Sequence, residues 1–143
     1  MSNFSRFMKE NKKSKVNGFY APTASLTDED GNPLQFEFKP ITSKENEQIR
    51  EDCTIDVQIT GKPNMFRPKL NTSKYLSKLI VKSCVMPDLY NAELQDSYGV
   101  KTPEDLLFAM VDDAGEYQDL CVWLQRFQGF TKTLDEKVEE AKN

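Results

Sequence analysis

The hydrophobic period of this sequence changes near residue 71, and that change limits the folds open to the chain. Before it, apolar and polar residues alternate in Leu34–Lys39 and Ile55–Thr60, with the two-residue period of a half-buried strand. After it, apolar residues recur at the three- and four-residue spacing of amphipathic helices. Strands followed by helices predict an α+β fold, with β-hairpins in the N-terminal half and a helical C-terminal half packed as one domain.

The length of the chain sets its domain organisation. With 143 residues, 38% of them hydrophobic, and with nine Phe, five Tyr and one Trp, one core is expected and two are not. We predict an N-terminal helical arm at residues 1–16, a single α+β domain at residues 17–130, and a C-terminal tail at residues 131–143. The tail has only Leu134 and Val138 to bury, so its predicted helix is expected to fray.

Two hairpins are predicted. The first spans residues 18–41 around the turn Asp28-Glu29-Asp30-Gly31-Asn32-Pro33, in which Gly permits a positive φ and Asp and Asn bond to the backbone. A calcium loop is the alternative, but the spacing and the closing Glu of an EF-hand are missing. The second spans residues 55–70, with Gly61-Lys62-Pro63-Asn64 as its turn and Pro68 favouring an edge strand.

Helix starts are marked by capping residues. Thr42-Ser43-Lys44-Glu45 forms a capping box, which predicts a helix to about Cys53 with Ile49 and Cys53 facing inward. Further helices are predicted from Thr72 until Pro87, over residues 91–98, from Thr102-Pro103, and over residues 113–128. The last of these places five residues on one face: Tyr117, Leu120, Cys121, Leu124 and Phe127.

Residues 3–13 predict a short amphipathic helix, because Phe4, Phe7 and Met8 fall at helical spacing. A helix of this length is marginal in water unless it packs against something. Its own domain and a partner protein are both open as that surface.

Charge is distributed unevenly around a net value of −4. Residues 1–20 carry five basic side chains and one acidic one, whereas residues 86–121 carry nine acidic side chains and one basic one. Two solvated surfaces would produce this pattern. A basic arm and an acidic helical part that contact each other, or that steer partners, would produce it too.

Enzymatic chemistry finds little support in the sequence. The chain has no His, so the usual general base and the triads that use it are absent, and no phosphate-binding glycine motif occurs. Asp112 and Asp113 form a carboxylate pair, but they stand at a predicted helix start, where acids are common. We therefore predict no catalytic residues, no cofactor and no enzymatic activity.

Cysteine usage indicates reduced thiols in the cytosol. Cys53, Cys84 and Cys121 are widely spaced, and no CxxC pair is present, which argues against a disulfide framework and a zinc site. The last two are expected to be small core residues. No apolar run approaches the length needed to cross a bilayer, and no secretory leader is evident.

A nucleic-acid-binding role would depend on basic side chains near aromatic ones. Lys62, Arg67 and Lys69 surround Phe66 on the second hairpin, and the arm carries further lysines, among them Lys9. The pI of about 5.0 opposes a broad electrostatic footprint for nucleic acid. Binding through apolar helical faces remains the favoured activity.

Several segments resemble the XkdN-like tail assembly chaperones of Gram-positive phages and of defective prophages such as PBSX. The resemblance extends from about residue 15 to residue 130, and the run from Ala92 to Val100 is its most specific part. The segments are Asp28–Pro33, Lys39–Ser43, Leu70–Leu76, Asn91–Val100, Leu106-Leu107 with Met110, Gly115–Tyr117 and Gly129-Phe130. The segment Cys84–Pro87 departs from the regular pattern of the family.

This resemblance implies a non-enzymatic protein of the host cytoplasm that coats the tape measure protein and keeps its long apolar helices soluble until tail tube subunits replace it. It also implies that copies of the chain associate along such a rod. The family has no agreed catalytic or ligand residues that could be assigned to positions in this sequence. A structural minor tail protein retained in the virion is the alternative. A host-directed nucleic-acid or regulatory binder is a third candidate. For the partner-binding face we predict four residues of the last helix: Tyr117, Trp123, Leu124 and Phe127.

Overall fold

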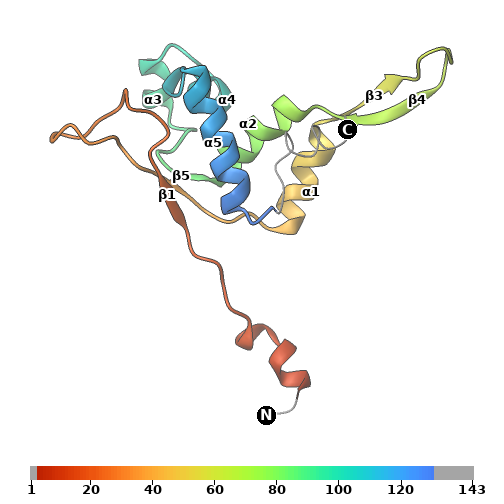
Figure 1. Cartoon of the computed structure of the whole chain (residues 1–143), viewed down its shortest axis with the longest axis horizontal. Helices are drawn as coiled ribbons and strands as arrows, with labels where there is room; N and C mark the ends of the chain where they lie inside the picture. Colours follow the sequence, from red (N-terminus) through yellow and green to blue (C-terminus); the bar gives the residue numbers. More distant parts are fainter. Residues whose placement is uncertain (1–2, 131–143) are drawn as a thin grey trace.

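A three-stranded antiparallel sheet packs against helices in the computed structural model, which describes residues 3–130 (Figure 1). The strands are β1 (Gly18–Tyr20), β2 (Phe36–Phe38) and β5 (Cys84–Met86), in the order β1-β2-β5. The α+β class expected from the sequence is confirmed. The predicted tail at residues 131–143 lies outside the described residues.

Strand β5 corrects the predicted course of the helix that follows residue 71. Helix α2 is Thr72–Ser83; Asn71, not Thr72, is its cap, because the Asn71 side chain accepts from the backbone N–H of Lys74. The helix ends before Pro87, and β5 pairs with β2 so that Cys84 lies opposite Phe38. Three residues are too few to show a period, and the pairing strand is remote in sequence, so only tertiary structure reveals β5.

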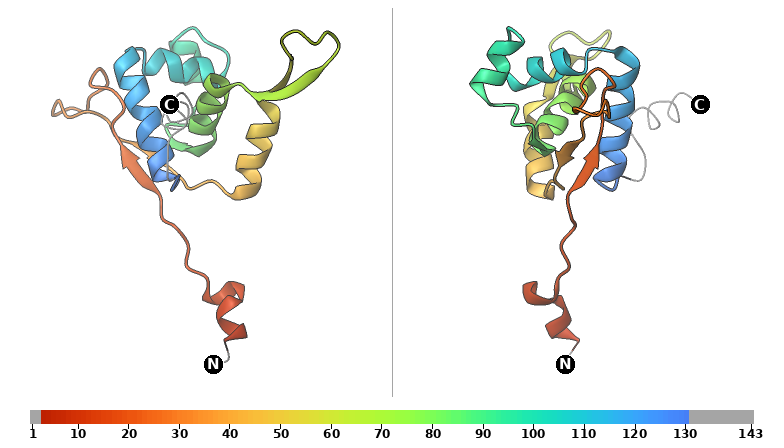
Figure 2. Two further views of the ribbon diagram at one scale, coloured as in Figure 1. Left: turned by 45° about the vertical axis from the view of Figure 1, so that its right-hand side comes forward. Right: turned by 90° about the vertical axis from the view of Figure 1, so that its left-hand side faces the viewer.

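Both predicted hairpins form. In the first, Gly18 pairs with Phe38, and the long connection between β1 and β2 contains the predicted turn. Asp28 makes that turn: its Oδ1 accepts from the backbone N–H groups of Asp30 and Asn32, both at 2.9 Å. The second hairpin joins β3 (Thr54–Gln58) to β4 (Phe66–Leu70) and projects from the body (Figures 1 and 2).

Apart from α2, the α-helices begin where the sequence predicts. Helix α1 (Ser43–Asp52) has the complete capping box: Thr42 Oγ1 accepts from Glu45 N at 3.1 Å, and Glu45 Oε1 accepts from Thr42 N at 3.0 Å. The remaining helices are each capped by a side chain that accepts from the first turn. They are α3 (Ala92–Ser97), α4 (Pro103–Met110) and α5 (Ala114–Phe127).

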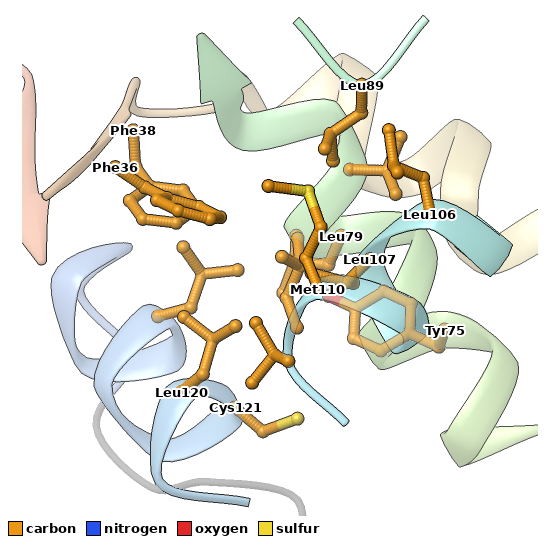
Figure 3. Packing of buried hydrophobic residues seen from close by; sticks show 14 of the residues in the cluster. Phe36, Phe38, Tyr75, Leu79, Leu89, Leu106, Leu107, Met110, Leu120 and Cys121 are labelled. Carbon is orange, nitrogen blue, oxygen red and sulfur yellow. The ribbon is translucent and has the colours of Figure 1, made fainter. Parts of the chain in front are cut away.

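The core lies between the sheet and helices α2, α4 and α5 (Figure 3). Phe36 and Phe38 point from β2 into this core and are 2% and 0% exposed, as the alternation in their strand predicts. Burial of such side chains is the main favourable term in folding. Helices α2, α4 and α5 contribute Tyr75, Leu79, Ile80, Leu106, Leu107, Met110, Leu120, Cys121 and Leu124.

The N-terminal arm differs from its prediction. Residues 3–13 form two short 3-10 helices, η1 (Phe4–Phe7) and η2 (Lys9–Asn11), in place of one α-helix. No residue of either helix is buried, and Asn3 makes no side-chain cap, so neither packing nor capping extends an α-helix here. Figures 1 and 2 show the arm leaving the body on an extended segment.

Candidate functional site

The four residues predicted for partner binding lie on α5, and the sheet covers much of this face. Leu124 is 1% exposed, within the core. Trp123 stacks on Tyr20 of β1 with ring centroids 4.8 Å apart, and on Phe127 at 5.1 Å. The ring of Tyr117 lies 4.9 Å from that of Phe108 on α4, and burial raises the pKa of its phenol.

The base of the arm closes the lower part of the same face. A Cβ atom on Gly18 would lie 2.7 Å from Phe127 Cε1, so β1 approaches the Phe127 ring as closely as glycine allows. Lys15 Nζ lies 4.9 Å from the centre of that ring and also donates a hydrogen bond to the Phe127 carbonyl oxygen.

Gln128, which follows α5, bonds to the segment after β2 and to the end of α2. Its Oε1 accepts from the backbone N–H of Ile41 at 2.9 Å. Its Nε2 donates to the Lys39 carbonyl oxygen at 3.1 Å and lies 2.9 Å from Ser83 Oγ. Leu124 is therefore inaccessible in the core, and β1 and Lys15 cover part of Trp123 and Phe127, so a partner could reach the predicted face only in part.

An open groove lies elsewhere, between α1 and α2. Its volume is about 380 Å³, and buried Ile49 and Val81 form its floor. Tyr90, in the connection between β5 and α3, stands at its rim with 67% of its surface exposed. A second hollow of about 340 Å³ shares Val81, Lys82 and Tyr90 with the first and adds Val85 of β5. The groove therefore continues along α2 towards the sheet edge.

The rim of this groove carries charges of both signs. Lys78 Nζ lies 3.3 Å from Glu104 Oε1, and Lys82 Nζ lies 3.6 Å from Glu45 Oε2. These four side chains are about a quarter to a half exposed, so each pair contributes at most about 1 kcal/mol. Such pairs can exchange partners at little cost when another molecule binds.

The groove has the features of a contact surface and not those of a reactive or metal-binding site in the described part of the chain. Cys84 lines the second hollow, and burial raises the pKa of its thiol to about 12; burial also raises the pKa of Cys53, which is not part of the groove lining. Both thiols are therefore protonated at neutral pH and are poor nucleophiles. Among residues 3–130, no cluster of three or more His, Cys, Asp or Glu is arranged to hold a metal ion. No helix in the same range is long and apolar enough to cross a membrane.

Comparison with protein families shows which kind of protein carries this groove. The model of the phage XkdN-like tail assembly chaperone family matches residues 4–142. This chain belongs to that family. It is a phage tail assembly chaperone, which is a non-enzymatic role, and the sequence resemblance is confirmed.

The relatives of the chaperone include proteins of Bacillus subtilis strain 168. The phage-like element PBSX protein XkdN and the protein YqbN are each 25% identical over 121 residues, which cover 82% of this chain and 78% of each relative. The crystal structure of YqbN superimposes with a TM-score of 0.72 at 19% identity, over 91% of this chain and 98% of that one. This likeness shows a shared fold.

The sequence does not reveal the groove of the chaperone. Its floor residues Ile49 and Val81 fit ordinary helical stripes, and such a stripe does not say which neighbour leaves a gap beside it. Val85 and Tyr90 lie in the segment that was expected to be the end of a helix and a loop. The only usable signal was the departure from family regularity at Cys84–Pro87, which marks β5.

Proposed function

We propose that this tail assembly chaperone binds the tape measure protein in the host cytoplasm and keeps its apolar helices in solution until tail tube subunits replace it. The observation that carries the proposal is the open groove along α2, which has an apolar floor and a charged rim. A long amphipathic helix without a partner aggregates through its apolar stripe, and a groove of this kind can cover part of that stripe.

The dimensions of the groove fit a few apolar side chains presented by one helix face. Ile49 and Val81 supply the floor, and Tyr90 and Val85 supply exposed apolar area beside it. The charged side chains on the rim fit the polar flanks of an amphipathic helix. Because exposed ion pairs are weak and screened by salt, the contact would be reversible, as a chaperone that is later displaced requires.

Binding at the α5 face remains the competing location for the same function. It requires β1 to separate from Trp123 and Phe127, whereas the groove requires no rearrangement of the described residues. The groove is therefore favoured.

Co-expression of the chaperone with the tape measure protein of the same tail tests the proposal. Affinity capture followed by light scattering is expected to show a soluble complex with the wild type. Tyr90→Asp with Val85→Asp is expected to lower the captured tape measure protein at least about tenfold, because two charges would enter the apolar edge of the groove. The matched control is Ile55→Asp with Phe66→Asp, two exposed apolar residues of the β3–β4 hairpin.

Two outcomes contradict parts of the proposal. If the tape measure protein precipitates equally with and without the wild-type chaperone, binding of this partner is wrong. If capture is lost only in the hairpin variant while the groove variant remains active and folded, the groove is the wrong surface. Mass spectrometry of purified virions tests the alternative of a minor tail protein, since a chaperone is expected to be absent from mature particles.

A further inference from the structure

The N-terminal arm presents apolar side chains to solvent. Phe4, Phe7 and Val16 are 75%, 86% and 78% exposed, and Met8 is 47% exposed. Five basic side chains accompany them against the single acid Glu10, so residues 3–16 carry a net charge of +4. Exposed apolar side chains on a projecting segment are typical of an element that is covered by a partner.

The helices that follow β5 carry the opposite charge. Residues 86–121 carry a net charge of −8, and exposed acids such as Glu93 and Asp96 of α3 and Asp105 of α4 belong to this set. Exposed aromatic rings lie among these acids: Tyr98 is 36% exposed and Phe108 is 46% exposed. We call the exposed acids of α3 and α4, together with Tyr98 just after α3 and Phe108 of α4, the acidic end.

The arm and the acidic end lie on opposite sides of the body. In Figures 1 and 2 the arm leaves from the edge near β1, and α3 and α4 lie at the far side in all three views. Lys15 is held at Phe127, which fixes the direction in which the arm leaves. Residues 12–17 have no regular structure and can reach at most about 20 Å from the body when extended.

We propose that the arm of one copy of this chain docks on the acidic end of a second copy, with Phe4 and Phe7 packing beside Phe108 and the basic side chains of the arm facing Asp96 and Asp105. The charges complement each other, and lysine and arginine also pack favourably over aromatic rings. Because the two surfaces differ and lie at opposite sides, the contact is heterologous and adds copies in a row. This inference does not depend on tape measure binding.

Sedimentation velocity of the full chain over a range of concentrations tests the proposal. The wild type is expected to form species larger than dimers at about 50 mM salt, and to dissociate towards monomers at about 500 mM salt, where the Debye length is short. Phe4→Ser with Phe7→Ser is expected to weaken association at least about tenfold. Since no residue of η1 or η2 is buried, circular dichroism of this variant should remain that of the wild type.

A charge-reversed variant tests the other surface. Asp96→Lys with Asp105→Lys is expected to be monomeric, whereas the control Glu47→Lys with Glu51→Lys, which makes the same charge change on exposed positions of α1, should associate like the wild type.

Mixing the two defective variants tests whether the arm and the acidic end are the two sides of one contact. The Phe4→Ser, Phe7→Ser variant keeps the acidic end, and the Asp96→Lys, Asp105→Lys variant keeps the arm, so their mixture should form one-to-one dimers and nothing larger. A wild type that stays monomeric at low salt would overturn the proposal. Association that survives in the folded arm variant, or a mixture that stays monomeric, would overturn it as well.

Discussion

Helix α5 and the β3–β4 hairpin both carry regularly spaced apolar side chains, but only α5 buries them. On α5, Leu120 and Leu124 are 0% and 1% exposed, and Trp123 is stacked between rings of β1 and its own helix. On the hairpin, Ile55 is 53% exposed and Phe66 is 62% exposed. Regular spacing of apolar side chains therefore marks a core in one region and an accessible surface in the other.

The difference arises from what packs against each region. The end of α5 is held by Gln128, by Lys15 and by the sheet, whereas the hairpin projects with exposed residues on both faces. Periodicity reports which side chains share a face, but the covering element comes from elsewhere in the chain. Matched substitutions in α5 and in the hairpin measure this difference in burial.

Leu124→Asp is expected to have the largest effect. It places a carboxylate in the core, so the free energy of unfolding should fall by about 4 kcal/mol or more. Ile55→Asp on the hairpin should change it by less than about 0.5 kcal/mol. Urea denaturation followed by circular dichroism measures both; equal losses would show that the two regions are equally buried.

Gln128→Ala should have the second-largest effect and lower the free energy of unfolding by about 2 kcal/mol. The substitution removes two part-buried bonds, to Ile41 N and to the Lys39 carbonyl oxygen, and the Ile41 N–H loses this partner, which is costly. The hairpin control is Gln58→Ala, at an exposed position of β3. If the Gln128 variant is as stable as that control, the hydrogen bonds of the Gln128 side chain contribute nothing to stability.

Gly18→Ala is expected to cost about 1–2 kcal/mol, because its Cβ would meet the Phe127 ring at 2.7 Å and force the ring to move. The chain offers a control of opposite sign. Gly115→Ala, in the first turn of α5, introduces a Cβ at an ordinary 3.4 Å from its nearest neighbour and should be neutral or slightly stabilising. Thermal unfolding of the two variants measures the contrast, and a stabilising Gly18→Ala would contradict the close packing of β1 on α5.

Glu45→Gln should have the smallest effect, and it should appear in the pH dependence. The backbone N–H of Thr42, first among several contacts, lowers the pKa of Glu45 below its ordinary value of 4.5. This stabilisation is complete above pH 4.5 and is lost as the pH falls through the lower pKa of the folded state.

The Gln variant should therefore show a shallower loss of stability in acid, and a loss below about 1 kcal/mol at neutral pH. Glu47→Gln, at an exposed position of the same helix, is the control. If the free energy of unfolding of the Glu45 variant falls in acid as steeply as that of the wild type, the Glu45 carboxylate does not contribute to the pH dependence of stability.

The sequence predicted the elements whose causes are local. The box at Thr42 and Glu45, the Asp28 turn and the Pro103 helix start are each set by neighbours within a few residues, and all are present. The predicted arm helix and the helix extending to Pro87 were wrong, because each needed a tertiary neighbour to decide its form.

The groove and the partial covering of the α5 face escaped prediction for the same reason. Val81 belongs to a helical stripe whether or not α1 leaves a gap beside it. The stripe of Tyr117, Leu124 and Phe127 was recognised correctly as one face, but nothing near it in sequence shows that Tyr20 and Gly18 cover it.

Hydrogen–deuterium exchange of the chaperone, alone and with the tape measure protein, measures which surface the partner covers. If the partner binds in the α1–α2 groove, exchange should slow on α1, α2 and the segment around Tyr90, with the amides of α5 unchanged. Protection confined to α5 and β1, with none along the α1–α2 groove, would contradict it.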